Sequence, residues 1–434
     1  MNTLKLMSFA AVSTLALSLA AAPFEYVITP DHTNHVYRLG ETASYTVKVF
    51  ERGGAAATAG VVRVTLDNFG PKRIAEAKWD LGTADSFTIS GALDEPGFLR
   101  LQLKSDKTPD KTWSVAYEPE KLVKGSPSPA DFDQFWEDAV KKYRRQFPGE
   151  PELVKVPEKS TADFDYYRIS LPTYGRRVHG YLSVPKDASK APYPVEIGVN
   201  AAGFGNWTNT MTGDKRLVRM QFSVYPFEPD WDWEKTGLKS KYDALNDECR
   251  RKYSTGYASS GIADSREDYF FYPVLLGVNR AVDWVVARPD VDRSRVYYSG
   301  TSQGGGFGFY LTGLNHSFTR AAFFVPAITD TMGYLKGRKS GWPSIIENNS
   351  QSPERRAAAE RNAPYFDGAN FASRIRCPVR VAVGFSDTTC APCAVYAAYN
   401  EIKVADKRIV HGLGMTHGCF PKYYNEFESW LRSK

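Results

Sequence analysis

Residues 298–306, with the sequence Y-S-G-T-S-Q-G-G-G, place Ser302 at the centre of a G-x-S-x-G motif. An apolar run at 295–298 precedes the serine and predicts a strand, and a helix-like run follows from Gln303 to about Leu314. A serine between a strand and a helix lies on a sharp turn, which exposes its hydroxyl above the unpaired N–H groups of the helix N-terminus. The motif therefore predicts that Ser302 is the nucleophile of an acyl-transfer reaction.

A serine nucleophile needs a general base, and the base needs an acid to orient it. In enzymes whose nucleophile lies on such a strand-to-helix turn, the acid (Asp or Glu) and then the histidine base follow the serine along the chain. Of the six histidines, only His411 and His417 lie in the expected zone. His411 adjoins the predicted strand 408–410, whereas His417 lies in a loop beyond its end, so we predict that His417 is the base. Asp387 directly follows another predicted strand and should orient the imidazole; alternatively, it caps a helix that begins near Thr388.

The oxyanion of the tetrahedral intermediate needs two preorganised hydrogen-bond donors. The backbone N–H of Gln303 is predicted to be one, because Gln303 directly follows the nucleophile. The other should come from the loop after an earlier strand. The stretch Asn200-Ala201-Ala202-Gly203 follows a buried-looking strand at 194–199, and Ala202 is the candidate donor. Small residues there let the backbone approach the substrate.

The composition of the 434 residues is that of an ordinary globular protein, with a net charge of +6. This length allows about two or three domains and at least one sizeable core. No block of Lys and Arg stands out, so the sequence argues against nucleic acid as a partner.

Residues 1–20 are predicted to be a secretory signal peptide. Lys5 precedes an apolar stretch from Leu6 to Ala20, and small residues suit cleavage after Ala20. No other apolar run approaches the roughly 20 residues that a membrane span needs. We therefore expect a periplasmic or secreted protein without a membrane span.

The five cysteines are Cys249, Cys377, Cys390, Cys393 and Cys419. An odd number leaves at least one of them without an intramolecular partner. The C-x-x-C spacing of Cys390 and Cys393 lies at a predicted helix start, where a thiol pKa can be lowered. Because the surroundings are those of a hydrolase, we favour packing cysteines or a local disulfide over a redox or metal site.

The chain divides into four predicted parts. The signal peptide is followed by an immunoglobulin-like β-sandwich at 21–118, where period-two patterns suggest about seven strands. This part carries no chemistry and would be a spacer or assembly surface, or alternatively would bind a glycan. A linker at 119–129 leads to the catalytic domain at 130–434. There, alternating strands and helices predict a mainly parallel sheet covered on both faces, the α/β-hydrolase fold.

Two long parts of the catalytic domain show no clear pattern. The stretch from about 204 to 262 is predicted to be irregular. A polar insertion of about 40 residues is predicted after the strand at 321–325.

From about residue 127 to the C-terminus, the sequence resembles the acetyl xylan esterase / cephalosporin C deacetylase family. The matching stretches are P-S-P-A-D-F-D-Q-F-W at 127–136, R-V-H-G-Y-L-S-V-P at 177–185, R-A-V-D-W-V at 280–285, G-T-S-Q-G-G-G at 300–306, G-F-S-D-T-T-C-A-P at 384–392 and A-A-Y-N at 397–400. The resemblance implies O-deacetylation of acetylated oligosaccharides by Ser302, Asp387 and His417, with neither a metal nor a cofactor.

The chain departs from that family at the oxyanion loop. The family usually has His-Gly-Tyr where this chain has Asn200-Ala201-Ala202, so a side chain that lines the acetyl pocket is absent. The tryptophans Trp207, Trp231 and Trp233 either form a sugar-stacking wall or pack a lid against the sheet. The family's usual assembly is a hexamer, which leaves a homo-oligomer open for a chain that adds an N-terminal domain.

Two other functions remain open at this point. A serine peptidase of the prolyl-oligopeptidase type uses the same triad order, but it carries a propeller in place of a small sandwich. A non-catalytic glycan-binding protein with a vestigial site fits the altered oxyanion loop and conflicts with the intact triad. Turnover of a simple acetate ester discriminates between these alternatives and the esterase.

Overall fold

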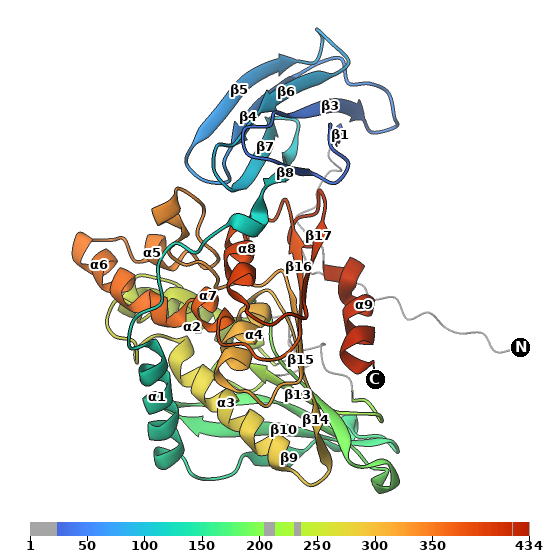
Figure 1. The fold of residues 1–434 in the computed structure, drawn as a ribbon. Helices are drawn as coiled ribbons and strands as arrows, with labels where there is room; N and C mark the ends of the chain where they lie inside the picture. The colour runs from blue at the N-terminus through green and yellow to red at the C-terminus, as the bar shows by residue number, and fades with distance from the viewer. Residues whose placement is uncertain (1–23, 204–212, 230–235, 419, 434) are drawn as a thin grey trace, which may run out of the picture.

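The computed structural model describes residues 24–203, 213–229, 236–418 and 420–433. These residues form a mainly parallel nine-stranded sheet with helices on both faces, preceded by two small sheets that lie at one end of it (Figure 1). The predicted α/β fold class, an α/β-hydrolase sheet after a small N-terminal β unit, is confirmed. The predicted signal peptide at 1–20 lies outside the described residues.

The two N-terminal sheets are built from strands whose residues alternate between buried and exposed positions. One sheet has the strand order β1-β3-β6, and the other has the order β2-β8-β7-β4-β5. Their strands pair antiparallel, except that β2 and β8 pair parallel. The bounds are β1 (Phe24–Pro30), β2 (Val36–Tyr37), β3 (Ala43–Glu51), β4 (Val61–Asp67), β5 (Arg73–Asp80), β6 (Phe87–Gly91), β7 (Gly97–Ser105) and β8 (Thr108–Tyr117). Inward-facing residues such as Tyr45, Val64 and Leu101 form a core of their own.

The strands of the large sheet have the order β17-β16-β15-β14-β12-β13-β11-β10-β9. From β17 to β13 neighbouring strands are parallel, and β11, β10 and β9 extend one edge antiparallel. The bounds are β9 (Glu152–Lys155), β10 (Phe164–Thr173), β11 (Arg176–Pro185), β12 (Tyr193–Val199), β13 (Val218–Ser223), β14 (Val291–Thr301), β15 (Arg320–Phe324), β16 (Val379–Gly384) and β17 (Lys407–Gly412). The parallel strands carry their carboxyl ends to one edge, where ligands bind in open α/β sheets.

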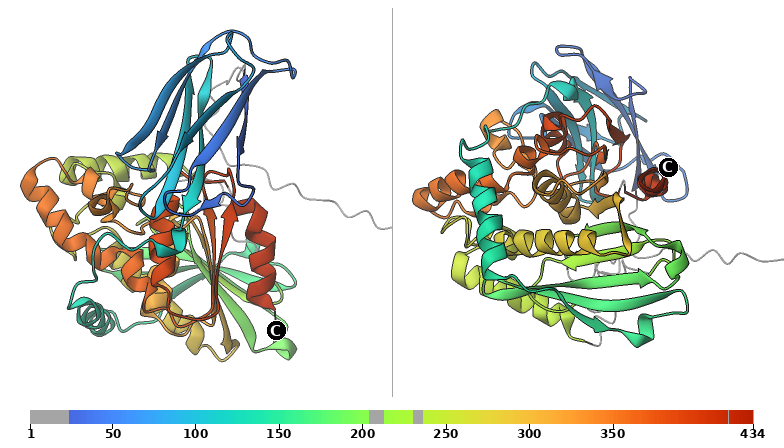
Figure 2. Two further views of the ribbon diagram at one scale, coloured as in Figure 1. Left: turned by 45° about the horizontal axis from the view of Figure 1, so that its top comes forward. Right: turned by 60° about the horizontal axis from the view of Figure 1, so that its bottom comes forward.

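Helices cover both faces of the large sheet (Figures 1 and 2). On one face α9 packs Phe427 and Leu431 against Phe324 of β15. On the other face α3 and α4 contribute to the main core together with Tyr298 and Phe323. The helix bounds are α1 (Phe132–Gln146), α2 (Leu238–Tyr253), α3 (Phe271–Ala287), α4 (Gln303–Leu314), α5 (Ile345–Asn348), α6 (Pro353–Asn362), α7 (Gly368–Ala372), α8 (Pro392–Glu401) and α9 (Phe420–Arg432). Short 3-10 turns are η1 (Pro119–Lys121), η2 (Pro157–Lys159), η3 (Ala188–Lys190), η4 (Tyr257–Ser259), η5 (Gly333–Lys336) and η6 (Ala363–Phe366).

One prediction about the irregular parts is wrong. The stretch 204–262 contains β13, which completes the parallel part of the sheet, and α2. The polar insertion after β15 is largely buried at 326–333 and contains three helices, α5 to α7. Its buried polar side chains pair with one another inside the protein. Among the described residues, no helix is both long and apolar enough to cross a membrane.

Candidate active site

Ser302 lies on a strained turn between the last residue of β14 and the first residue of α4. Its φ of 56° and ψ of −118° are unusual for a residue other than glycine, as in the nucleophile turn of α/β-hydrolases. A Cβ at Gly300 would lie 2.5 Å from the carbonyl oxygen of Gly304, and a Cβ at Gly304 would lie 2.1 Å from that of Val199. Positions 300 and 304, two residues before and after Ser302, therefore have room only for glycine.

The structure brings together the three residues of the predicted triad. Nε2 of His417 lies 3.0 Å from Oγ of Ser302, and Nδ1 lies 2.8 Å from Oδ2 of Asp387. Because a carboxylate only accepts, Nδ1 carries the proton toward Asp387, which leaves Nε2 free to accept the proton of the serine hydroxyl. This is the hydrogen-bonded order that a general base needs to activate a serine.

Asp387 is fully buried, and its carboxylate is nevertheless well paired. Oδ1 accepts hydrogen bonds from the backbone N–H groups of Thr389 (2.8 Å) and Cys390 (2.9 Å), while Oδ2 faces His417. The alternative role as a helix cap is wrong, because α8 begins at Pro392 and Ala391 is its N-cap residue. The turn after β16 instead fixes the carboxylate in the orientation that holds the imidazole.

His411 lies in β17, away from the nucleophile. Its Nε2 lies 2.5 Å from the hydroxyl of Tyr396, and its ring packs 4.8 Å from that of Phe385, centroid to centroid. Burial lowers the pKa of His411 below its usual range, so the ring is neutral near pH 7. The geometry therefore pairs His417, and not His411, with Ser302.

The loop predicted to supply the second oxyanion donor follows β12, and Ala202 is half-buried in it. Gln303 is fully buried at the start of α4, and its Nε2 donates to the carbonyl of Asn200 at 3.2 Å. Its Oε1 accepts from the hydroxyl of Tyr257 at 2.8 Å. The side chain of Gln303 thus ties the start of α4 to the loop after β12.

Two tyrosines that sequence reasoning missed form hydrogen bonds that support this loop. The N–H of Gly203 donates to the hydroxyl of Tyr225 at 2.9 Å, and that hydroxyl donates to Tyr257 at 3.3 Å. Burial raises the pKa of both tyrosines above the ordinary value of 10, so both are protonated at neutral pH. Both lie in the stretch that was predicted to be irregular, so no strand or helix pattern marked them.

The remaining residues singled out in the sequence are three tryptophans and five cysteines. Trp207, Trp231 and Trp233 lie outside the described residues. Cys249, Cys377, Cys390 and Cys393 are buried and form no disulfide with one another, which supports the packing interpretation for these four; Cys419 is outside the described residues. Ligand atoms of Asp387, Cys390 and His417 lie within 4.8 Å of one another, as metal ligands could, but both ring nitrogens of His417 are already hydrogen-bonded.

Comparison with known proteins agrees with this geometry. The family model for acetyl xylan esterase (AXE1) matches residues 117–433. The acetyl esterase Axe7A of Xylanibacter ruminicola is 27% identical over 396 residues, which cover 90% of this chain and 86% of the relative. Acetyl xylan esterases from Paenibacillus sp. R4 and Thermoanaerobacterium sp. JW/SL YS485 share the fold, with TM-scores of 0.60 and 0.59 at 24% and 21% identity, covering 72% and 73% of this chain and 98% of each of theirs. The chain therefore belongs to the acetyl xylan esterase (AXE1) family and is an ester hydrolase of that family.

Proposed function

We propose that this protein is a secreted serine carbohydrate esterase that removes O-acetyl groups from xylo-oligosaccharides or similar acetylated sugars. The observation that carries the proposal is the hydrogen-bonded chain from Ser302 through His417 to Asp387, with 3.0 Å and 2.8 Å between the paired atoms. The relatives are an acetyl esterase and two acetyl xylan esterases, which supports acetyl as the acyl group.

The reaction proceeds in two halves. Oγ of Ser302 attacks the acetyl carbonyl carbon while its proton passes to Nε2 of His417. The bond to the sugar oxygen then breaks, and His417 returns the proton to that oxygen, which leaves acetyl-Ser302. A water molecule, deprotonated by His417, attacks the acetyl group and releases acetate with Ser302 restored. Asp387 keeps Nδ1 protonated and stabilises the imidazolium throughout.

The N–H groups of Gln303 and Ala202 are proposed to stabilise the oxyanion of each tetrahedral intermediate. The loop that carries Ala202 has only small side chains between Asn200 and Phe204, so the acyl pocket should accept acetyl groups and, less well, slightly longer ones. Each added methylene in an apolar pocket changes binding by only about 1–3 kcal/mol, so discrimination by chain length should be gradual. The tryptophans Trp207, Trp231 and Trp233 remain candidates for stacking against the sugar.

Secretion is part of the proposal. Its support is the apolar stretch from Leu6 to Ala20 behind Lys5 at the N-terminus. Mass spectrometry of the protein exported from an expression host tests it: a mature N-terminus at Ala21 is expected, and retention of Met1 in the exported protein would contradict it.

One panel of substrates tests the chemistry. Acetyl, butyryl and octanoyl esters, an acetylated xylo-oligosaccharide and a proline-containing amide are compared under one condition. We expect acetate release to be fastest, with activity falling from acetyl to octanoyl. Faster cleavage of the amide than of every acetate ester would favour the peptidase, and no turnover of any substrate would favour the non-catalytic glycan-binding protein.

A further inference from the structure

The N-terminal sheets are packed into the hydrolase rather than held at a distance by the linker. Phe69, Phe98 and Ala116 belong to the hydrophobic core of the large sheet, not to the core of their own sheets. Phe98 and Leu99 are adjacent on β7 and both fully buried, yet Phe98 packs into the hydrolase core and Leu99 into the N-terminal core. The N-terminal sheets therefore complete the hydrolase core at the edge where the triad loops lie.

Phe98 contacts the loop that carries the acid of the triad. Its ring meets that of Phe385 edge to face, with centroids 5.1 Å apart and planes at 85°. Phe385 lies two residues before Asp387 in the same turn after β16. Edge-to-face aromatic pairs are favoured over face-to-face stacking, so Phe98 helps to fix the position of Phe385, from which the Asp387 turn departs.

Trp113 of β8 contacts the loop that carries the base. A Cβ at Gly414 would lie only 2.2 Å from Cη2 of Trp113, so the indole lies directly against the backbone of Gly414, three residues before His417. Thr416 and Gly418 of this loop are exposed, and Leu413 packs against the main core. The indole is therefore one of the surfaces that support the His417 loop.

The two triad loops are also joined to each other. The N–H of Ser386 donates to the carbonyl of Met415 at 2.9 Å, and that of Phe385 donates to Gly412 at 3.1 Å. Movement of either loop is therefore transmitted to the other. Phe98 packs against the Asp387 loop and Trp113 packs against the His417 loop. Together these two side chains therefore affect the positions of both Asp387 and His417.

A third contact reaches the turn of Asp387 through the insertion after β15. The N–H of Lys339 donates to the carbonyl of Phe69 at 3.1 Å, and the ammonium of Lys339 donates to the carbonyl of Thr388, next to Asp387. Asn68 donates to the carbonyl of Gly337 at 2.9 Å. The turn between β4 and β5 thus holds the segment that supports the Asp387 turn from outside.

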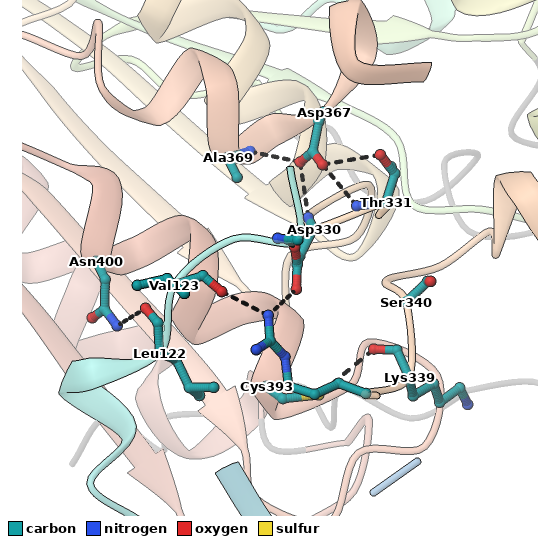
Figure 3. A network of polar contacts seen from close by, with 12 residues as sticks. Leu122, Val123, Asp330, Thr331, Lys339, Ser340, Asp367, Ala369, Cys393 and Asn400 are labelled. Atoms are coloured by element: carbon teal, nitrogen blue, oxygen red, sulfur yellow. Dashed lines mark hydrogen bonds and ion pairs between the residues drawn. The ribbon is translucent and has the colours of Figure 1, made fainter. Parts of the chain in front are cut away.

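The linker is fixed by a buried polar network (Figure 3). Arg338 donates to the carbonyl of Val123 at 2.7 Å and to Asp330 at 2.8 Å, and Asp330 accepts from the N–H of Gly125 at 2.6 Å. Asn400 donates to the carbonyl of Leu122 at 2.8 Å. The segment between β8 and α1 is therefore anchored along its length, which restricts movement of the N-terminal sheets relative to the triad loops.

We propose that the N-terminal β unit is a positioning element of the active site, in which Phe98 and Trp113 hold the Asp387 and His417 loops at hydrogen-bonding distance from each other and from Ser302. This inference rests on the proposed triad function. It differs from the predicted role of spacer, assembly surface or glycan-binding module, because it assigns the unit a direct effect on the rate of the chemical step.

The test compares two adjacent residues of β7 in the full-length protein. Phe98→Ala removes the contact with Phe385, and Leu99→Ala, the matched control, removes an equally buried side chain from the N-terminal core. For each variant kcat and KM are measured on an acetate ester, together with Tm and the rate at which a fluorophosphonate labels Ser302. A displacement of the order of 1 Å at a catalytic group can reduce the rate about 100-fold.

We expect Phe98→Ala to lower kcat and the labelling rate by roughly 10- to 100-fold, with KM nearly unchanged. Leu99→Ala should lower Tm and leave kcat and labelling unchanged below its melting range. Trp113→Ala should behave like Phe98→Ala, and Trp113→Phe should restore part of the rate. If Phe98→Ala does not fold, Trp113→Ala carries the test, since its ring is only partly buried and ends at the His417 loop.

Equal changes of kcat in Phe98→Ala and Leu99→Ala, or unchanged kcat and labelling in both Phe98→Ala and Trp113→Ala, would overturn the inference. These outcomes are distinct from failure of the proposed function. That failure would appear as a wild-type protein inactive on every acetate ester, or as a Ser302→Ala variant that keeps its activity.

Discussion

Nδ1 of His417 lies 2.8 Å from Oδ2 of Asp387, although the two residues are 30 positions apart in the chain. The pair forms because β16 and β17 are parallel neighbours, so the turns that follow them leave the sheet at the same edge. His411 lies within β17 and points its Nε2 to Tyr396 instead. The sheet topology thus decides which histidine can serve Ser302.

The two histidines are predicted to differ widely on substitution. His417→Ala removes the group that accepts the proton of Ser302, and kcat should fall by about three orders of magnitude or more. His411→Ala removes a contact with Tyr396 and Phe385 and should act mainly on Tm. Steady-state kinetics and thermal unfolding of both variants check this. A loss of kcat in His411→Ala as large as that in His417→Ala would reverse the assignment.

The tyrosines beneath the oxyanion loop are predicted to affect kcat. Tyr225→Phe leaves the N–H of Gly203 without its acceptor, and Tyr257→Phe removes the donor to Gln303. A hydrogen bond of this kind contributes about 1 kcal/mol, so each variant should lose roughly 5- to 10-fold in kcat if the loop shifts.

A matched control is Tyr143→Phe, which removes a buried hydroxyl bonded at 2.7 Å to the carbonyl of Pro172, far along the sheet. It should leave kcat unchanged. A kcat for Tyr225→Phe and Tyr257→Phe no lower than that of this control would show that the two hydroxyls do not order the loop.

The sequence was informative wherever a motif coincides with a regular element. Ser302, Asp387 and His417 each adjoin a strand or helix whose pattern is clear. Because each of the three follows a strand of a predicted parallel sheet, they are expected at the same edge of that sheet. The oxyanion roles of Gln303 and Ala202 were predicted from their positions relative to such elements and stay predictions. The sandwich pattern likewise indicated the N-terminal sheets, with the strands that contain Tyr45 and Leu101.

Contacts between distant segments could not be predicted in the same way. Nothing in the sequence distinguishes Tyr225 and Tyr257 from the other tyrosines. Only the fold brings the hydroxyl of Tyr225 to the N–H of Gly203 and that of Tyr257 to Tyr225. The insertion after β15 is polar, yet Asp330 and Asp367 are buried there. Burial of such groups depends on partners such as Arg338, which a local pattern does not reveal.

Asp367 is predicted to make stability depend on pH. Burial, together with the nearby Asp330 carboxylate, raises the pKa of Asp367 to about 6 from 3.8. The folded protein therefore binds a proton more tightly than the unfolded chain between these two values, and the contribution of Asp367 to stability increases as pH falls through 6. Its magnitude is on the order of 2 kcal/mol between pH 7 and pH 4.

Chemical unfolding at several pH values checks this dependence in the wild type and in Asp367→Asn. The difference in the free energy of unfolding between the two proteins should grow in favour of the wild type as pH falls from 7 to 4. A difference that stays constant over this range would show that Asp367 has an ordinary pKa in the folded protein.

The buried cysteines are predicted to be unreactive in the folded protein. Burial raises the pKa of Cys377 to about 12 and that of Cys393 to about 11, which removes the reactive thiolate at neutral pH. In a Cys419→Ser background, a thiol reagent should modify none of the remaining four until the protein is denatured, and reductant should leave activity unchanged. Rapid stoichiometric modification of the native protein would contradict the burial of these thiols.

Acetate release by Ser302→Ala tests the triad mechanism most directly. Ser302 is 7% exposed and the substitution removes only its hydroxyl, so the variant should fold with an unchanged Tm. Loss of the nucleophile should reduce kcat on an acetate ester by about three orders of magnitude or more, leaving only the catalysis of binding and the oxyanion donors. A folded Ser302→Ala variant that keeps more than about a tenth of the wild-type rate would contradict the triad mechanism.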